Sequence, residues 1–241
     1  MKKAIYSIAL LLTILTTGAQ AQDKKVAVVT FYAVKQVNVG LAGETAKLAV
    51  KLADDPSFNV APMLTNFHDQ FFNDYAKSFP FQLLPENDVI NNDAYKAYVP
   101  VGEEVTSGVF KDTYNLPYTG YKIVLPLKSH TNDKNLLGMF NQADGIMKVY
   151  IDFSLSQVGF AGMGVAKITA AANITLLNKD GEKVFAIREE GKSKASSPLI
   201  NGIPVMSPEK ILPMCEDALT QLMARLQKDM PKIIKKTNAK L

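Results

Sequence analysis

Three successive runs of residues between 144 and 196 restrict the fold of this chain more than any other stretch, because apolar and polar side chains alternate along them. A period of two is typical of a β-strand with one buried and one solvated face. The first run has apolar side chains at alternate positions, namely Met147, Val149, Ile151, Phe153 and Leu155. The second run repeats the pattern at Ala166, Ile168, Ala170, Ala172, Ile174 and Leu176. We expect both sets to face the protein core.

Short connections that contain glycine join the three runs. Residues 159–164 include three glycines, and residues 178–181 read Asn-Lys-Asp-Gly. Gly181 suits a tight-turn position that requires a positive φ. The third run, 182–196, follows directly. Three strands with such short connections form an antiparallel meander, and the rest of the chain has to cover its apolar face.

The rest of the chain reads as helices and short strands. The β-branched run 25–34 predicts a buried first strand, and the runs 80–85 and 122–127 predict two more. We therefore expect an α+β fold, a mixed β-sheet with a C-terminal antiparallel meander, flanked by amphipathic helices. Apolar residues spaced three and four apart predict these helices over 46–53, 63–79, 86–98, 132–142 and from Pro208 onward.

Residues 1–21 are typical of a secretory signal peptide. They contain a basic start, an apolar stretch at 5–15 that is too short to span a membrane, and the small-x-small cleavage site Ala19-Gln20-Ala21. No cysteine lies near the predicted cut, so we do not expect a lipid anchor. We expect a periplasmic or secreted protein with no transmembrane segment after signal cleavage, and a single domain over residues 22–231.

The charge of the chain argues against a nucleic-acid partner. Loss of Lys2 and Lys3 with the signal peptide lowers the formal net charge from +4 to +2. Residues 232–241 carry four lysines and no acid, which predicts a basic, solvated tail and leaves the preceding domain at −2. A nucleic-acid-binding face requires clustered Lys and Arg on the body, whereas the chain has only two arginines, Arg188 and Arg225.

No catalytic, cofactor or metal motif fits its context in this sequence. Residues 191–193 match the end of a phosphate-binding loop, but Ala186 stands where the motif needs a glycine. His68 lies on a predicted helix, and Phe72 occupies the position one turn later where a second metal ligand would be required. We therefore expect a polar surface histidine, no metal site, no cofactor and no enzymatic activity.

The tyrosine-rich stretch 99–121 shows no sustained periodicity, and the longer segment 99–127 looks like an insertion. Loops of this length are uncommon in compact domains unless they are functional or disordered, and disordered segments are poor in aromatic residues. Tyrosine offers a flat apolar face and a hydroxyl, which suits stacking on a sugar or holding a peptide. The alternative is that the rings attach the loop to the sheet. We predict that some of Tyr98, Tyr114, Tyr118 and Tyr121 form an exposed patch that binds an envelope glycan or protein.

Phe160 and Met163 lie among the glycines of the connection 159–164. One interpretation is a loop that folds back on the core. The other is an exposed hairpin tip that inserts into a partner or a membrane surface. Replacement of both residues by serine distinguishes the two, since the first interpretation predicts lost stability and the second predicts normal stability with lost association.

Several segments resemble an exported protein superfamily. VAVVTF at 26–31, the amphipathic helix after it and FPFQLLPENDV at 79–89 resemble the opening of the curli secretion lipoprotein, of the TolB amino-terminal domain and of the outer-membrane activators of penicillin-binding proteins. LLGMFNQADGIMKVYIDFSL at 136–155 and TLLNKDGEKVF at 175–185 resemble the helix, long strand and hairpin that follow. The anchoring cysteine of those lipoproteins is absent here. The resemblance implies a nonenzymatic envelope or assembly protein on a mixed sheet flanked by helices, and it transfers no functional residue.

The sequence thus favours a nonenzymatic binding or assembly factor of the cell envelope, whose partner is an envelope protein or glycan. Two other classes stay open. A hydrolase acting on an envelope polymer would require His68 or His130 to meet a carboxylate or a serine in a pocket. A small-lipid carrier would require a closed cavity lined by Ile, Leu and Phe. The sequence leaves the oligomeric state open.

Overall fold

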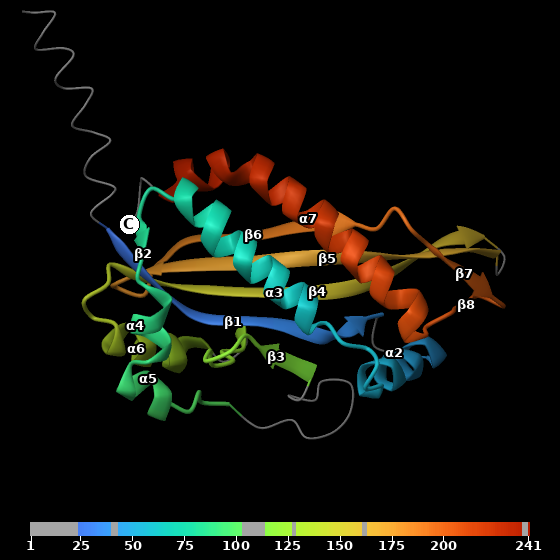
Figure 1. Ribbon diagram of the computed structural model, residues 1–241, viewed down its shortest axis with the longest axis horizontal. Helices are drawn as coiled ribbons and strands as arrows, with labels where there is room; N and C mark the ends of the chain where they lie inside the picture. Colours follow the sequence, from blue (N-terminus) through green and yellow to red (C-terminus); the bar gives the residue numbers. More distant parts are fainter. Residues whose placement is uncertain (1–23, 40–42, 103–113, 127–128, 161–162, 238–240) are drawn as a thin grey trace, which may run out of the picture.

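The computed structural model describes residues 24–39, 43–102, 114–126, 129–160, 163–237 and 241, so the predicted signal peptide lies outside the described residues. One mixed β-sheet forms the centre of the molecule (Figure 1). In this sheet β1 runs parallel to β4, whereas β5 pairs antiparallel with β4 on one side and with β6 on the other. The four long strands lie in the order β1 (Lys25–Asn38), β4 (Gly145–Phe160), β5 (Met163–Asn178) and β6 (Lys183–Lys192). This arrangement confirms the predicted α+β class.

Four short strands extend the sheet. Strand β2 (Gln82–Leu83) pairs in parallel with the start of β1. Strand β3 (Asn115–Pro117) pairs antiparallel with a later part of β1. Beyond β6 in the sequence, β7 (Ser197–Ile200) pairs with the first part of β5, and β8 (Ile203–Pro204) pairs with β7. Of these four, only β2 lies within a strand predicted from the sequence.

The meander has the predicted phase. On β4, Met147, Val149, Ile151 and Phe153 are buried, and on β5 every apolar position from Ala166 to Leu176 in the predicted set is buried. Gly181, in the turn between β5 and β6, has the expected positive φ of 80°. Local alternation was enough to fix these positions, because a strand that shifts by one residue turns its whole apolar set toward water.

The apolar face of the sheet is covered by α7 (Pro208–Thr237) and α3 (Ala61–Gln70), which cross it side by side (Figure 1). A π-helical turn, η1 (Phe71–Tyr75), and a 3₁₀ turn, η2 (Ala76–Ser78), continue α3. Helix α7 runs through Pro231 as far as Thr237, so the predicted basic tail at 232–241 is helical over its first six residues. Its buried stripe includes Ile211, Cys215, Ala218, Leu222 and Leu226.

The opposite face of the sheet is covered at one end only. There α4 (Glu86–Ile90), α5 (Asp93–Ala97) and α6 (Ser129–Met139) enclose a second apolar cluster against the start of β1 and β4. This cluster includes Ala27, Val29, Tyr95, Leu136, Phe140 and Ile146. Further along this face, β4 presents half-buried polar side chains instead of apolar ones. Helix α2 (Glu44–Asp54) contacts β1, and its Leu52 belongs to the main core cluster.

Two predicted elements are wrong in detail. The single helix expected over 86–98 is two short helices, because the Asn92 side chain accepts from the Tyr95 backbone N–H and begins a new helix. Residues 122–126 form no strand. Their backbone bonds to side chains instead, since the Thr30 hydroxyl donates to the Lys122 carbonyl at 2.6 Å and accepts from the Val124 N–H at 3.3 Å.

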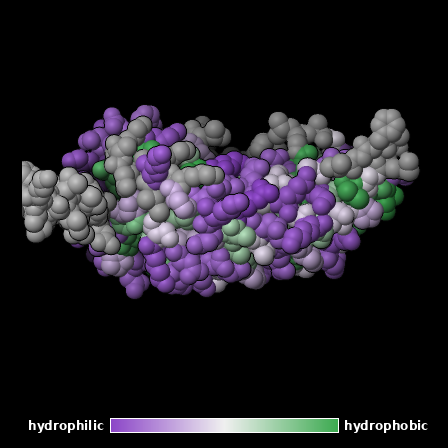
Figure 2. All heavy atoms as spheres, turned by 90° about the horizontal axis from the view of Figure 1, so that it is seen from above, coloured by the Kyte–Doolittle hydropathy of each residue, from purple (hydrophilic) through white to green (hydrophobic). Residues whose placement is uncertain are grey.

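The surface is largely hydrophilic on the side that Figure 2 shows, and hydrophobic residues gather near the end of the molecule where β7 and β8 lie in Figure 1. Three exposed apolar residues belong to these strands and to the adjoining start of β5, namely Val165, Ile200 and Ile203. Within the described residues, no helix is both long enough and apolar enough to cross a membrane.

Candidate functional site

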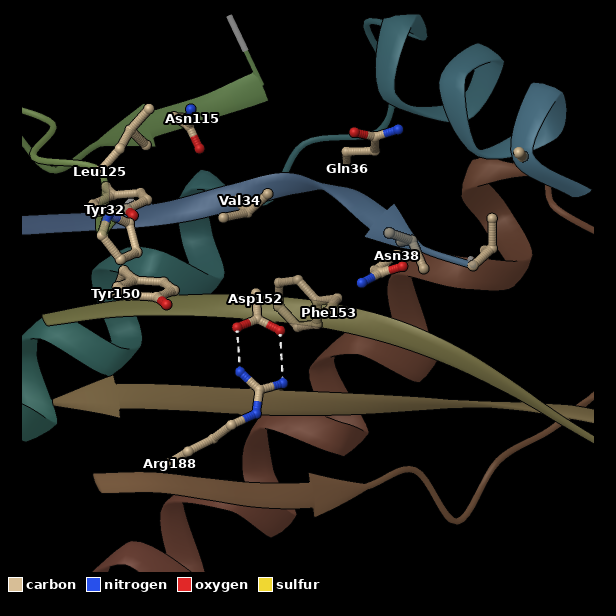
Figure 3. Close-up of a pocket in the computed structure, with 14 residues that line it drawn as sticks. Tyr32, Val34, Gln36, Asn38, Asn115, Leu125, Tyr150, Asp152, Phe153 and Arg188 are labelled. Carbon is tan, nitrogen blue, oxygen red and sulfur yellow. Dashed lines mark hydrogen bonds and ion pairs between the residues drawn. The ribbon is translucent and has the colours of Figure 1, made fainter. Parts of the chain in front are cut away.

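The strands β1 and β4 separate midway along their parallel pairing. The ladder runs to the pair Ala33 and Ile151 and resumes at Val37 and Phe153, so Asp152 alone stands opposite three residues of β1, 34–36. Such irregularities turn side chains in new directions and are common beside functional sites. A cleft of about 350 Å³ opens at this point (Figure 3).

The cleft combines polar and apolar walls from six parts of the chain, one of which is α2 through Ala46. Strands β1, β3, β4 and β6 supply the polar side chains, and the segment 125–126 adds apolar surface. The polar lining consists of Tyr32, Gln36, Asn38, Asn115, Tyr150, Asp152 and Arg188. The apolar lining includes Val34, Val37, Val39, Leu125, Pro126 and Phe153.

A stacked pair of tyrosines forms one wall. Tyr32 and Tyr150 are partners in the β1–β4 ladder, and their ring centroids lie 5.0 Å apart with planes only 11° apart. Tyr32 is 1% exposed, and Tyr150 is half-buried. Both hydroxyls point along the sheet in the same direction (Figure 3), and neither has a hydrogen-bond partner among the described residues. Burial raises the pKa of both phenols, so each stays neutral at physiological pH.

An ion pair forms the floor beside the tyrosines. The Arg188 guanidinium donates to both Asp152 carboxylate oxygens, at 2.8 and 3.1 Å (Figure 3). The Arg188 Nε donates to Glu190 at 2.9 Å. Asn173 connects the pair by donating to Asp152 at 2.7 Å and accepting from Arg188 at 3.0 Å. The hydrogen bonds to Asp152 raise the pKa of Arg188. The charged groups that line the cleft therefore neutralise one another.

The register places these side chains in one row across the sheet. Tyr32 is opposite Tyr150, Tyr150 is opposite Asn173, and Asn173 is opposite Arg188, on β1, β4, β5 and β6 in turn. Residues directly opposite on one face of a sheet contact each other. The row is thus a property of the strand pairing, and the cleft lies where the row meets the irregular part of β1.

The four tyrosines expected to form an exposed patch are not exposed. Tyr98, Tyr114 and Tyr121 are buried, and Tyr118 is half-buried. The Tyr98 hydroxyl donates to Asn132, and the Tyr114 hydroxyl donates to Asp54 at 2.9 Å. The prediction of an exposed patch is wrong, because Tyr98, Tyr114 and Tyr121 are packed in the interior, and the first two use their hydroxyls to bond other parts of the chain. The rings attach their segment to the body of the protein, as the alternative interpretation held.

The other two predicted residues lie at the end of the long β4–β5 hairpin. Phe160 and Met163 are partners in the last pair of its ladder. Their side chains lie outside the described part of the structure, as do residues 161 and 162. The choice between a core-directed loop and an inserting tip therefore stays a prediction.

His68 is buried at 6% exposure, so its expected position on the polar surface is wrong. Its Nε2 lies 2.7 Å from Glu86 Oε1, its Nδ1 lies 3.3 Å from Asp69 Oδ1, and its ring stacks on Tyr118 at 3.6 Å. The sequence pattern missed this because the buried face of α3 is wider than its apolar stripe. His68 meets a carboxylate but does not line the cleft, and His130 is exposed.

None of the residues that line the cleft was predicted as a binding residue from the sequence. The alternation of the first run places Tyr150 and Asp152 together on the polar face, which is the one local signal that pointed to them. Nothing local in the sequence indicated that Tyr32 lies beside them. Among the described residues, no group of three or more His, Cys, Asp or Glu side chains could hold a metal ion.

Comparison with known proteins adds no functional assignment. No family model and no curated protein matches the sequence. Similar solved structures include the hypothetical protein CT253 from Chlamydia trachomatis (8% identity, 86% of this chain and 98% of that chain, TM-score 0.36). The lipoprotein GNA1162 from Neisseria meningitidis is also similar, with 8% identity, over 70% of this chain and 82% of that chain, at a TM-score of 0.30. A Helicobacter pylori protein assigned as a neuraminyllactose-binding hemagglutinin homolog is similar with 6% identity, over 90% of this chain and 87% of that chain, at a TM-score of 0.37. At these TM-scores, the likenesses transfer neither a function nor a residue role to this chain.

Proposed function

We propose that this chain is a nonenzymatic, exported protein of the cell envelope that binds its ligand in the cleft between β1 and β4. The observation that carries the proposal is the Tyr32 hydroxyl, which lies on an almost fully buried side chain, faces the cleft and has no partner among the described residues. Buried polar groups are nearly always hydrogen-bonded. A hydroxyl left open in this position suits a group supplied from outside the chain.

The lining supports binding better than catalysis. Its residues include no Ser, Cys or His that could act as a nucleophile or a base. Its one carboxylate, Asp152, is held by Arg188 and Asn173. The hydrolase alternative would have to use His68, whose two ring nitrogens both face carboxylate oxygens away from the cleft.

Two further points bear on the class of protein. The predicted signal peptide at 1–21 supports export, and the resemblance to envelope assembly proteins supports a binding role. The lipid-carrier alternative has less support, because α7 covers the apolar face of the meander and the cleft carries seven polar side chains. A lipid site would instead be lined almost wholly by apolar groups.

The experiment is a capture assay with a blocked cleft. The mature chain, 22–241, is immobilised and exposed to envelope extract, next to the variants Asn115→Trp and Gln142→Trp. Asn115 lines the cleft, whereas Gln142 is an exposed amide outside it, so both variants add the same bulk in different places. We expect the parent and Gln142→Trp to retain the same component and Asn115→Trp to lose it. Equal capture by all three folded proteins would overturn the proposal.

A further inference from the structure

We infer that the cleft selects a neutral saccharide, an inference that rests on the proposed function. The charged groups that line the cleft favour a neutral ligand. Arg188 donates hydrogen bonds from both terminal nitrogens to Asp152 and from its Nε to Glu190. An acidic ligand would have to break this network to reach the guanidinium, and a cationic ligand would have to break it to reach Asp152. The cleft therefore favours a ligand without charge.

The polar groups in the cleft that are open to a ligand also suit a saccharide. Four lining groups have no hydrogen-bond partner among the described side chains and backbone, namely the Tyr32 and Tyr150 hydroxyls and the Gln36 and Asn115 amides. Each of these groups both donates and accepts. Sugar hydroxyls also donate and accept, so several of them can pair with this set in more than one orientation.

The position of the cleft also suits a saccharide better than a peptide. Extended peptides gain affinity by adding to a free strand edge, where main-chain groups are available. The cleft instead lies on the face of the sheet, where the side chains of Tyr150 and Asp152 project from β4 and that of Arg188 projects from β6 (Figure 3). Its hydrogen-bonding groups are side chains, which suit scattered hydroxyls better than a regular main chain.

Size and apolar surface agree with this class. Sites for small ligands have volumes of about 300–1,000 Å³, and the cleft, at about 350 Å³, lies at the low end. That space suits one or two sugar rings rather than a long chain. Val34, Val37, Leu125 and Pro126 supply apolar surface between the polar groups, as the C–H faces of a sugar require.

The test uses an array of immobilised neutral oligosaccharides, acidic oligosaccharides and capped uncharged peptides, with the mature chain as the probed protein. We expect binding to neutral oligosaccharides above the other two classes. The strongest binder is then titrated against Tyr32→Phe, which removes one hydroxyl and keeps the stack on Tyr150. The dissociation constant should rise about threefold to tenfold, as for one lost hydrogen bond. Tyr118→Phe, whose hydroxyl lies outside the cleft, should bind as the parent does.

Each other outcome decides the question. Binding only to acidic oligosaccharides, only to peptides or to nothing on the array overturns the saccharide inference. If Asn115→Trp still abolishes capture from envelope extract in that case, the proposed function stands without it. If Asn115→Trp captures like the parent, both fail. Equal affinity of Tyr32→Phe and the parent for a bound saccharide would place that saccharide outside the cleft and overturn the inference as well.

Discussion

Gly191 of β6 lies against the backbone of Leu222 in α7, so closely that a Cβ added to it would stand 2.0 Å from the Leu222 nitrogen. It would also stand 2.5 Å from the Ala218 carbonyl oxygen. The glycine that imitates a phosphate-binding loop in the sequence therefore serves the contact between helix and sheet.

We expect Gly191→Ala to lower the free energy of unfolding by about 3 kcal/mol, the upper end for overpacking, because the clashing atoms belong to backbone that cannot rotate away. Gly138 of α6 is the matched control, since an added Cβ there meets nothing within 4 Å. Gly138→Ala should raise the free energy of unfolding by up to about 1 kcal/mol, because alanine has a higher helix propensity than glycine. Urea unfolding of both variants measures the two changes in the free energy of unfolding. If both changes had the same sign, the assigned packing of Gly191 would be contradicted.

Phe153 tests the phase of β4. Its side chain is fully buried, between the core and the cleft. Phe153→Ala should cost about 3–5 kcal/mol, whereas Ser154→Ala, one residue along on the polar face, should change stability by less than about 0.5 kcal/mol. Thermal or urea unfolding checks both. A melting curve that Phe153→Ala leaves unchanged would mean that the strand faces the other way.

The two histidines provide a matched pair. His68→Ala removes a buried ring and leaves Glu86 without its 2.7 Å contact, so we expect a loss of about 1–3 kcal/mol in the free energy of unfolding. His130 is exposed, and His130→Ala should fall within about 0.5 kcal/mol of the parent. Similar stability of the two variants would show that the stack of His68 on Tyr118 contributes little.

Asp217 predicts a pH-dependent contribution to stability. Its carboxylate accepts from the backbone N–H groups of Ala195 and Lys194, at 3.0 and 2.5 Å, and these hydrogen bonds hold its pKa below the usual range. A carboxyl with a lowered folded-state pKa stabilises the protein above its unfolded pKa of about 3.9, and this stabilisation is lost as the pH falls through the folded pKa.

We therefore expect Asp217→Asn to lower the melting temperature at pH 7, and the difference from the parent to shrink below about pH 4. Melting curves recorded across this range measure the effect. Glu216→Gln, a change at an exposed neighbouring carboxyl, should follow the parent at every pH. A difference for Asp217→Asn that persists unchanged at low pH would contradict the role of its charge.

Export remains to be measured. We expect the mature protein to begin at Gln22 and to fractionate as soluble envelope protein, because residues 1–21 carry the features of a cleaved signal peptide. Amino-terminal sequencing of the purified native protein decides this. Intact Met1 on cytoplasmic material would exclude the proposed compartment.

The sequence predicted what depends on neighbours along the chain. The alternation in β4 and β5 placed Phe153 and Ile174 in the core, and both are buried there. The sequence predicted a strand at residues 122–126, where the structure has none. The Thr30 hydroxyl, about ninety positions away, bonds to their backbone, and a local pattern cannot indicate such a distant partner. Tyr114 was read as available for a ligand because its partner Asp54 lies sixty positions earlier.

The cleft escaped prediction for the same reason. Tyr150 and Asp152 could be assigned to one face from the alternation alone. Their meeting with Tyr32 depends on the parallel pairing of β1 with β4 and on its interruption between Ala33 and Val37. Register shifts of this kind leave no mark on the apolar pattern, since the side chains on both sides of the shift are buried as usual.

The parallel pairing of β1 with β4 also sets the order in which the chain can fold. The β4–β5–β6 meander joins neighbours through short turns, whereas β1 must close a loop of about a hundred residues before it gains a single hydrogen bond in the ladder. Closure of a long loop costs entropy before its contacts repay it, so folds rich in distant contacts form slowly. We therefore expect the meander to form first and β1 to dock on it late. Since Tyr32 arrives only with β1, the proposed binding site would be completed at the end of folding, and ligand affinity would then report the completed sheet.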